Sequence, residues 1–132
     1  MSYIKSMFAA RPVEPSSDRS VAIECITACY SCAEACTACA DSCLGEKAVQ
    51  HQVSCIRLDL DCADICLATA RLASRLTATN KALVGAQLRA CATACEICAV
   101  ECEQHAAKME HCRICAEACR RCVAACEALL AE

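Results

Sequence analysis

Residues 25–43, "CITACYSCAEACTACADSC", contain six cysteines separated by gaps of four, three, four, three and four residues. Gaps that alternate between three and four keep successive side chains on one face of an α-helix. At a rise of ~1.5 Å per residue, this cysteine seam is about 27 Å long. It takes the positions that apolar side chains occupy in a helical bundle. We therefore expect a helix whose cysteines face inward.

Three further segments repeat the same spacing. They are "CIRLDLDCADIC" (55–66), "CATACEICAVEC" (91–102) and "CRICAEACRRCVAAC" (112–126). The expected helices cover about residues 17–44, 48–75, 79–106 and 109–131. Residues 1–15 read as an irregular N-terminal arm, because Pro12 and Pro15 interrupt them. The predicted fold is all-α, with residues 16–132 forming an antiparallel up-down-up-down four-helix bundle around a cysteine-lined core.

The composition makes cysteine the main filler of that core. The 132-residue chain has 18 cysteines but only two tyrosines, one phenylalanine and no tryptophan. Its formal net charge of −3, without a basic stripe interleaved with aromatics, argues against nucleic acid as a partner. No uninterrupted apolar run approaches ~18 residues, so no membrane span is expected. The N-terminal residues lack a secretory or twin-arginine signal, which predicts a cytoplasmic location.

The predicted topology makes the two ends of the bundle different. The first and third turns share one end, which collects His51, His105, Met109 and His111. The seam residues expected at the opposite end are mainly apolar: Ala22, Thr69, Ala73, Leu76, Val84, Leu88 and Leu129. We expect a core of thiols that apolar residues close at one end. The other end, which we call the open end, carries the histidine side chains.

Packing and disulfides explain so many cysteines poorly. A free cysteine packs as a small apolar residue, but in ordinary cores cysteine does not replace leucine at nearly every inward-facing position. Dense disulfides are typical of small, loop-rich secreted proteins. Cysteines one helical turn apart also point their Cβ atoms roughly parallel, which suits a disulfide poorly. Metal binding is the remaining hypothesis.

Charge balance favours Cu(I) among the thiophilic metals. Many thiolates in a low-dielectric interior need neutralisation, and one Cu⁺ per thiolate leaves the core neutral. A tetrathiolate zinc site keeps two negative charges. We predict multiple Cu(I) ions, roughly one per cysteine. An iron–sulfur electron carrier and a zinc or cadmium thiolate buffer remain as alternatives, although their C-x-x-C spacing arises in any helical seam of this kind.

The candidate ligands are the thiols and a few side chains near the open end. His51 and His105 continue the cysteine register, whereas His111 lies one residue off it. Met109 is either a thioether ligand or a packing residue. Asp59 also occupies a seam position. Its carboxylate is either an oxygen ligand or a proton acceptor during copper loading, or else it faces a solvent gap. The predicted thiolate ligands are Cys25, Cys29, Cys32, Cys36, Cys39, Cys43, Cys55, Cys62, Cys66, Cys91, Cys95, Cys98, Cys102, Cys112, Cys115, Cys119, Cys122 and Cys126.

Over residues 16–131, the four cysteine seams resemble those of the copper storage protein family, and in particular its cytosolic branch. The resemblance implies a homotetramer of four-helix bundles that stores Cu(I) without catalysis, so no enzyme activity is expected. It also implies that His51, His105, His111 and Met109 mark the copper entrance. Besides copper ions, we expect copper chaperones or chelators as partners.

Overall fold

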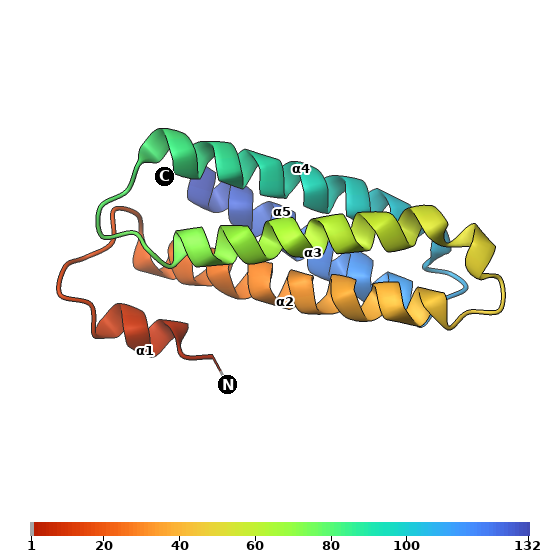
Figure 1. Cartoon of the computed structure of the whole chain (residues 1–132). Coiled ribbons are helices and arrows are strands. Elements are labelled where there is room, and N and C mark those ends of the chain that lie inside the picture. The colour runs from red at the N-terminus through yellow and green to blue at the C-terminus, as the bar shows by residue number, and fades with distance from the viewer. Residues whose placement is uncertain (1) are drawn as a thin grey trace.

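The computed structural model describes residues 2–132, and within that range it contains helices and no strand. Four long helices run alternately up and down, side by side (Figure 1). The elements are α1 (Ile4–Ala9), α2 (Arg19–Leu44), the 3₁₀ turn η1 (Val49–His51), α3 (Val53–Ala73), α4 (Lys81–His105) and α5 (Glu110–Leu130). The predicted all-α, antiparallel four-helix bundle is confirmed.

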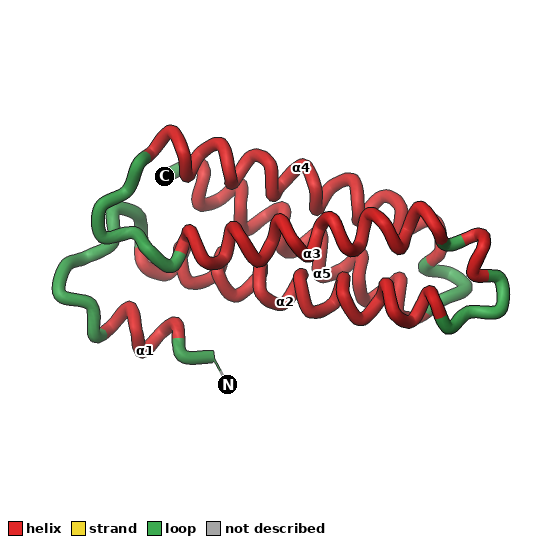
Figure 2. Tube along the Cα trace, in the orientation of Figure 1, coloured by secondary structure: helices red, strands yellow, loops and turns green. Residues whose placement is uncertain are grey.

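Each long helix packs against two neighbours: α2 and α4 both contact α3 and α5. The connections between them lie at the two ends of the bundle (Figure 2). Short connections of this kind force consecutive helices to run antiparallel. The loops after α2 and after α4 therefore meet at one end, and the N-terminal arm and the α3–α4 loop meet at the other (Figure 1).

Side-chain caps mark the start of two of these helices. Asp18 Oδ1 accepts hydrogen bonds from the backbone N–H groups of Ser20 and Val21, at 2.9 and 3.1 Å. Asn80 Oδ1 accepts one from the N–H of Leu83 at 3.1 Å. These bonds satisfy N–H groups that lack a partner within the helix.

The α2–α3 connection differs from the expected helix range. The sequence predicts a second helix from about residue 48, but α3 begins at Val53. The residues between fold as η1, and Gln52, which follows it, is buried. A histidine expected on the helix, His51, therefore lies in the turn instead.

The N-terminal arm is more ordered than an irregular segment. It contains α1, whose Phe8 side chain is fully buried against the bundle. The Arg11 guanidinium lies 3.9 Å from the Phe8 ring centroid and donates to the Ser74 carbonyl oxygen at 2.6 Å. The Ser16 N–H donates to the Leu76 carbonyl oxygen at 3.0 Å. One buried ring and these hydrogen bonds hold the arm against the end of α3.

That end of the bundle is closed by apolar packing. Phe8 from the arm and Ile26 from α2 join the seam residues expected there, and Val84 is only partly buried. The expected residues that are buried are Ala22, Thr69, Ala73, Leu76, Leu88 and Leu129. Between this apolar end and the α2–α3 loop, the interior consists mainly of cysteine.

Two helices are long and apolar enough to cross a membrane by length and composition alone. They are α2 and α4, with 18-residue windows of mean hydropathy 1.2 and 1.4. Cysteine and alanine contribute much of that hydropathy, and the inward face of a bundle helix passes the same test. The cysteines of both helices are buried inside the bundle, which accounts for their apolar character.

Candidate metal centre

The cysteine side chains of all four long helices converge on the axis of the bundle. All 18 are buried free thiols. Sulfurs from different helices come within van der Waals distance: Cys66 Sγ lies 3.5 Å from Cys95 Sγ, and Cys29 Sγ lies 3.6 Å from Cys122 Sγ. A disulfide would require about 2.05 Å. The core is therefore a set of closely spaced, separate sulfur donors.

These sulfurs form groups that share members. Each group holds four donor atoms that all lie within 4.8 Å of one another. Cys122, Cys32 and the pair Cys36 and Cys119 each belong to two groups, so neighbouring groups are linked along the axis. Four of these groups consist of thiols alone: Cys29–Cys91–Cys122–Cys126, Cys32–Cys66–Cys95–Cys122, Cys32–Cys36–Cys62–Cys119 and Cys36–Cys98–Cys115–Cys119. A linked series of sulfurs suits soft cations that share bridging thiolates.

Asp59 is fully buried within this series, so it does not face a solvent gap. Its Oδ1 accepts hydrogen bonds from the thiols of Cys98, Cys115 and Cys102 at 3.1, 3.3 and 3.5 Å. Its Oδ2 accepts one from Cys55 at 3.9 Å. Burial, followed by the negative charge that neighbouring thiols would carry, raises the pKa of Asp59 to about 12. The carboxyl group is therefore neutral at pH 7 when no metal is bound.

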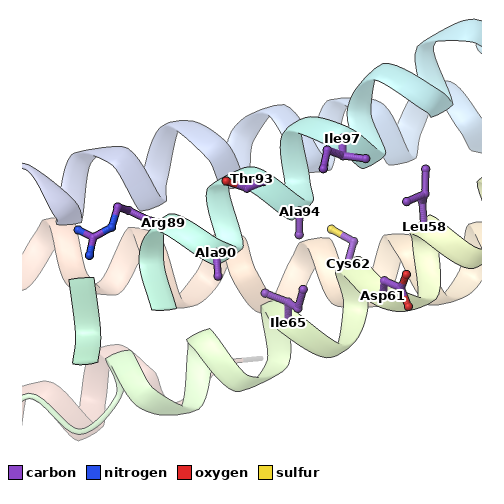
Figure 3. Close-up of a pocket in the computed structure, with 9 residues that line it drawn as sticks. All are labelled: Leu58, Asp61, Cys62, Ile65, Arg89, Ala90, Thr93, Ala94 and Ile97. Atoms are coloured by element: carbon purple, nitrogen blue, oxygen red, sulfur yellow. The ribbon is translucent and has the colours of Figure 1, made fainter. Parts of the chain in front are cut away.

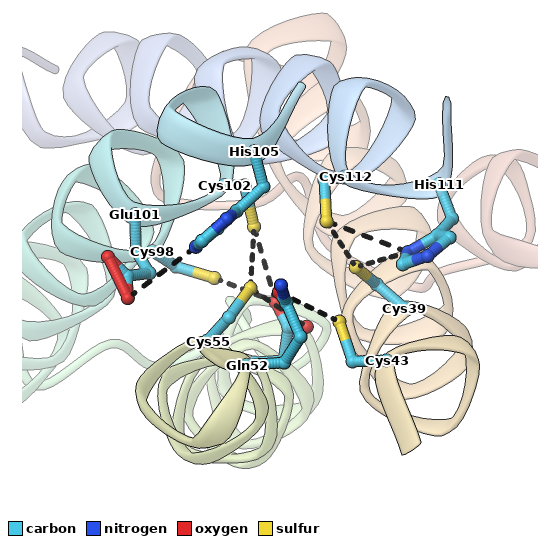
Figure 4. A network of polar contacts seen from close by, with 11 residues as sticks. Cys39, Cys43, Gln52, Cys55, Cys98, Glu101, Cys102, His105, His111 and Cys112 are labelled. Atoms are coloured by element: carbon cyan, nitrogen blue, oxygen red, sulfur yellow. Dashed lines mark hydrogen bonds and ion pairs between the residues drawn. The ribbon is translucent and has the colours of Figure 1, made fainter. Parts of the chain in front are cut away.

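His111 brings an imidazole to the thiols at the open end (Figure 4). Its Nδ1 lies 3.3 Å from Cys39 Sγ and 3.6 Å from Cys112 Sγ, and its Nε2 lies 3.0 Å from Glu46 Oε1. Cys39, Cys43, Cys112 and His111 make a further four-donor group, which we call the mouth group. Burial lowers the pKa of His111, but hydrogen bonds to Cys39 and Glu46 outweigh it and raise the pKa above its ordinary value.

The other expected entrance residues lie at the same end but not in the mouth group. His105 is half-buried at the end of α4, with Nε2 4.0 Å from Glu101 Oε1 (Figure 4). Met109, the residue before α5, packs partly buried against the core. His51 is exposed in η1, so the expectation that it continues the cysteine register of α3 is wrong. Its backbone leaves the α-helical path before the register can extend to it.

Two polar residues at this end were not among the sequence candidates. Gln52 is buried, and its Oε1 accepts a hydrogen bond from the Cys43 thiol at 3.9 Å. Glu46 lies in the loop after α2 and contacts His111. Periodicity assigns side chains to faces only inside a helix, so it carries no signal for a loop residue such as Glu46.

A cavity of about 450 Å³ lies between α3 and α4 on the side of the bundle (Figure 3). Its lining is mostly apolar, and Cys62 is the one thiol in it. The lining residues are Leu58, Asp61, Cys62, Ile65, Arg89, Ala90, Thr93, Ala94 and Ile97. Because the donor groups lie along the bundle axis, the metal chemistry belongs to the core and not to this cavity.

Comparison with known proteins points to one family. A family model described as "Copper storage protein" matches residues 18–131. The structure of the copper storage protein Ccsp from Streptomyces lividans, loaded with 10 copper equivalents, is 48% identical. The match covers 97% of this chain and 98% of that one, with a TM-score of 0.94.

A second structure supports the same assignment. The cytosolic copper storage protein from Streptomyces lividans, with five coppers, is 53% identical over 87% of this chain and 96% of that one, with a TM-score of 0.85. No curated protein matches the chain.

Proposed function

This chain belongs to the copper storage protein family, and from that premise we propose that it stores Cu(I) on the thiols inside the bundle, with roughly one ion per cysteine. The observation that carries the proposal is the linked series of buried sulfur groups along the axis. Such a series holds many soft cations in a small volume, as storage requires.

The shared sulfurs favour Cu(I) over zinc, cadmium or an iron–sulfur cluster. A structural zinc site uses four ligands that belong to one ion. Here Cys32 and Cys122 each lie in two groups, so separate four-thiolate sites would compete for the same sulfurs. Cu(I) is satisfied by two or three thiolates that it shares with neighbouring ions. Its single charge also balances one thiolate, which keeps the interior neutral.

We assign the ligands by their burial and by the donor groups to which they belong. The 18 cysteines are the storage ligands. Asp59 adds an oxygen donor in the middle of the series once it releases its proton, and its raised pKa leaves it no capacity to accept protons from the thiols. His111 is the imidazole ligand of the mouth group, which supports this end as the copper entrance. His105 and Met109 line the approach to the mouth group, and His51 is exposed in η1.

The remaining features follow the family. Residues 16–132 act as the storage unit and residues 1–15 as its arm, without catalytic turnover. The relative with five coppers is cytosolic, and we place this protein in the cytoplasm too. Copper chaperones or chelators would deliver the metal. A homotetramer is supported by large apolar side chains exposed on α3 and α4, among them Leu60, Leu67 and Ile97.

Anaerobic titration of the metal-free, reduced protein tests the proposal directly. Cu(I) binding should saturate on the order of one ion per cysteine, and the loaded protein should be colourless with thiolate-to-copper bands in the ultraviolet. A parallel titration with Zn(II) should saturate at a handful of ions. Copper binding no greater than zinc binding would refute Cu(I) storage. A brown protein purified anaerobically would indicate an iron–sulfur carrier instead.

A further inference from the structure

The two ring nitrogens of His111 face opposite kinds of partner. Nε2 lies 3.0 Å from Glu46 Oε1, and Nδ1 lies 3.3 Å from Cys39 Sγ. The ring comes from the first turn of α5, whereas the carboxylate comes from the loop after α2. Contact between these segments therefore arises only in the folded bundle.

A carboxylate accepts hydrogen bonds and cannot donate them, so it selects one form of the ring. With the proton on Nε2, the ring donates to Glu46, and the Nδ1 lone pair faces the mouth thiols. With the proton on Nδ1, the Nε2 lone pair would lie 3.0 Å from the lone pairs of Glu46 Oε1. The neutral ring is therefore held with its metal-binding nitrogen free and directed at the sulfurs of Cys39 and Cys112.

We propose that Glu46 is a positioning residue for copper uptake: it fixes the orientation and tautomer of His111, so that Nδ1 captures the arriving ion together with the mouth thiols. This inference rests on the proposed function, since it concerns the first ion to bind. Carboxylates that hold a ligating imidazole in this way raise its basicity and remove the need to move a proton within the ring.

His105 provides a contrast at the same end of the bundle. Its Nε2 lies 4.0 Å from Glu101 Oε1, beyond hydrogen-bond distance. Among the described residues, no hydrogen bond joins the His105 ring to a thiol. Within residues 2–132, His111 is the histidine that combines a carboxylate on one nitrogen with sulfurs at the other, so the proposal is specific to the Glu46–His111 pair.

Ring nitrogen chemical shifts test the tautomer without any copper. In ¹⁵N-labelled, metal-free protein at a pH where the ring is neutral, wild-type His111 should show a protonated Nε2 and an unprotonated Nδ1. In Glu46→Ala, the neutral ring should populate both tautomers, so both nitrogen shifts should move towards the average of the two. Glu46→Gln, whose side-chain oxygen still accepts from Nε2–H, should stay close to wild type. A proton on Nδ1 in the wild-type protein, or unchanged shifts in Glu46→Ala, would overturn the proposal.

Uptake kinetics test whether the tautomer matters. With Cu(I) delivered anaerobically from its bicinchoninate complex, Glu46→Ala should take up the first equivalent about tenfold more slowly and keep its full capacity. Glu46→Gln should recover most of that rate. The control Glu110→Gln removes a negative charge beside His111, from a residue paired with Arg113, and should leave the rate unchanged.

A double variant separates positioning from simple attraction of the cation. If Glu46 acts through the ring, Glu46→Ala should have no further effect in a His111→Ala background. A similar slowing in both backgrounds would mean that Glu46 only attracts Cu⁺, and would overturn the proposal. Failure of the wild-type protein to bind copper would refute storage, but the chemical shifts would still report the tautomer.

Discussion

Asp59 Oδ1 accepts a hydrogen bond from the Cys98 thiol at 3.1 Å, deep inside the bundle. Cys98 belongs to one of the four-thiol groups, and the same carboxyl group also contacts Cys55 and Cys102, whose sulfurs lie 3.7 Å apart. Asp59 is thus an oxygen acceptor placed between thiols of different helices. The cysteine series accommodates it because the carboxyl group is protonated there and carries no charge.

Asp59→Asn should stabilise the metal-free protein more as pH rises. The pKa of Asp59 is about 12 in the folded state, above its ordinary value, so the folded state retains a proton that the unfolded state loses. Stability of the wild-type protein therefore falls as pH rises above ~4, by at most about 1.4 kcal/mol per pH unit from this group. Urea unfolding under reducing conditions at pH 5, 6 and 7 measures the difference. A constant difference between the two proteins would contradict a neutral, buried Asp59.

Copper uptake should slow as pH falls, with an inflection that belongs to His111. Its pKa is raised, so the ring gains a second proton at a higher pH than an ordinary histidine, and that proton blocks Nδ1. Thiols must also release protons as the metal binds, which weakens affinity further in acid. Stopped-flow uptake between pH 5.5 and 8.5 should show the inflection in wild type but not in His111→Ala. An identical profile in both would assign it to the thiols.

Removing a thiol that two four-sulfur groups share should cost more copper than removing Cys43 of the mouth group. Cys32 belongs to two four-sulfur groups and lies 3.7 Å from Cys119 Sγ. Cys32→Ala should therefore lower the capacity by more than one ion, because a bridging ligand serves neighbouring sites. Cys43→Ala, at the mouth, should lower it by about one ion. Anaerobic titration followed by native mass spectrometry counts the ions. Equal losses would favour independent sites.

Metal removal should leave the helices intact. The thiols are fully packed by neighbouring side chains, and α2 and α4 have side-chain caps of their own. Far-ultraviolet circular dichroism of the metal-free protein should therefore resemble that of the loaded form. Tm should rise with loading, because the preorganised thiols of the folded state bind copper more tightly than those of the unfolded chain. A random-coil spectrum after chelation would show that copper builds the bundle.

The arm should contribute stability without affecting storage. Phe8 is fully buried at the closed end, where Arg11 covers its ring. Phe8→Ala should lower the free energy of unfolding by up to about 3 kcal/mol, near the low end of the range for a buried ring, because the arm can detach rather than leave a cavity. Met7→Ala, which changes an exposed neighbour in α1, is the matched control. Copper capacity should be the same in both variants, and a lower capacity in Phe8→Ala would link the arm to the metal core.

The sequence alone determined the four long helices and their inward faces, and it favoured Cu(I) among the thiophilic metals. Gaps of three and four residues place the cysteines from Cys25 to Cys43 on one stripe, and burying that stripe requires partner helices. The charge of many thiolates then selects a monovalent soft ion. These conclusions depend only on helical geometry and composition, so no tertiary contact was needed to reach them.

The tertiary structure decided which side chains meet at the mouth. Sequence spacing alone puts His51 in register with the cysteines, but His51 is exposed in η1, whereas His111 lies one residue off the seam and reaches Cys39. Glu46 has no sequence signal, because a loop has no periodicity. A repeat along a helix defines a face of that helix. Where helices end, the packing of separate segments against one another sets the position and direction of each side chain.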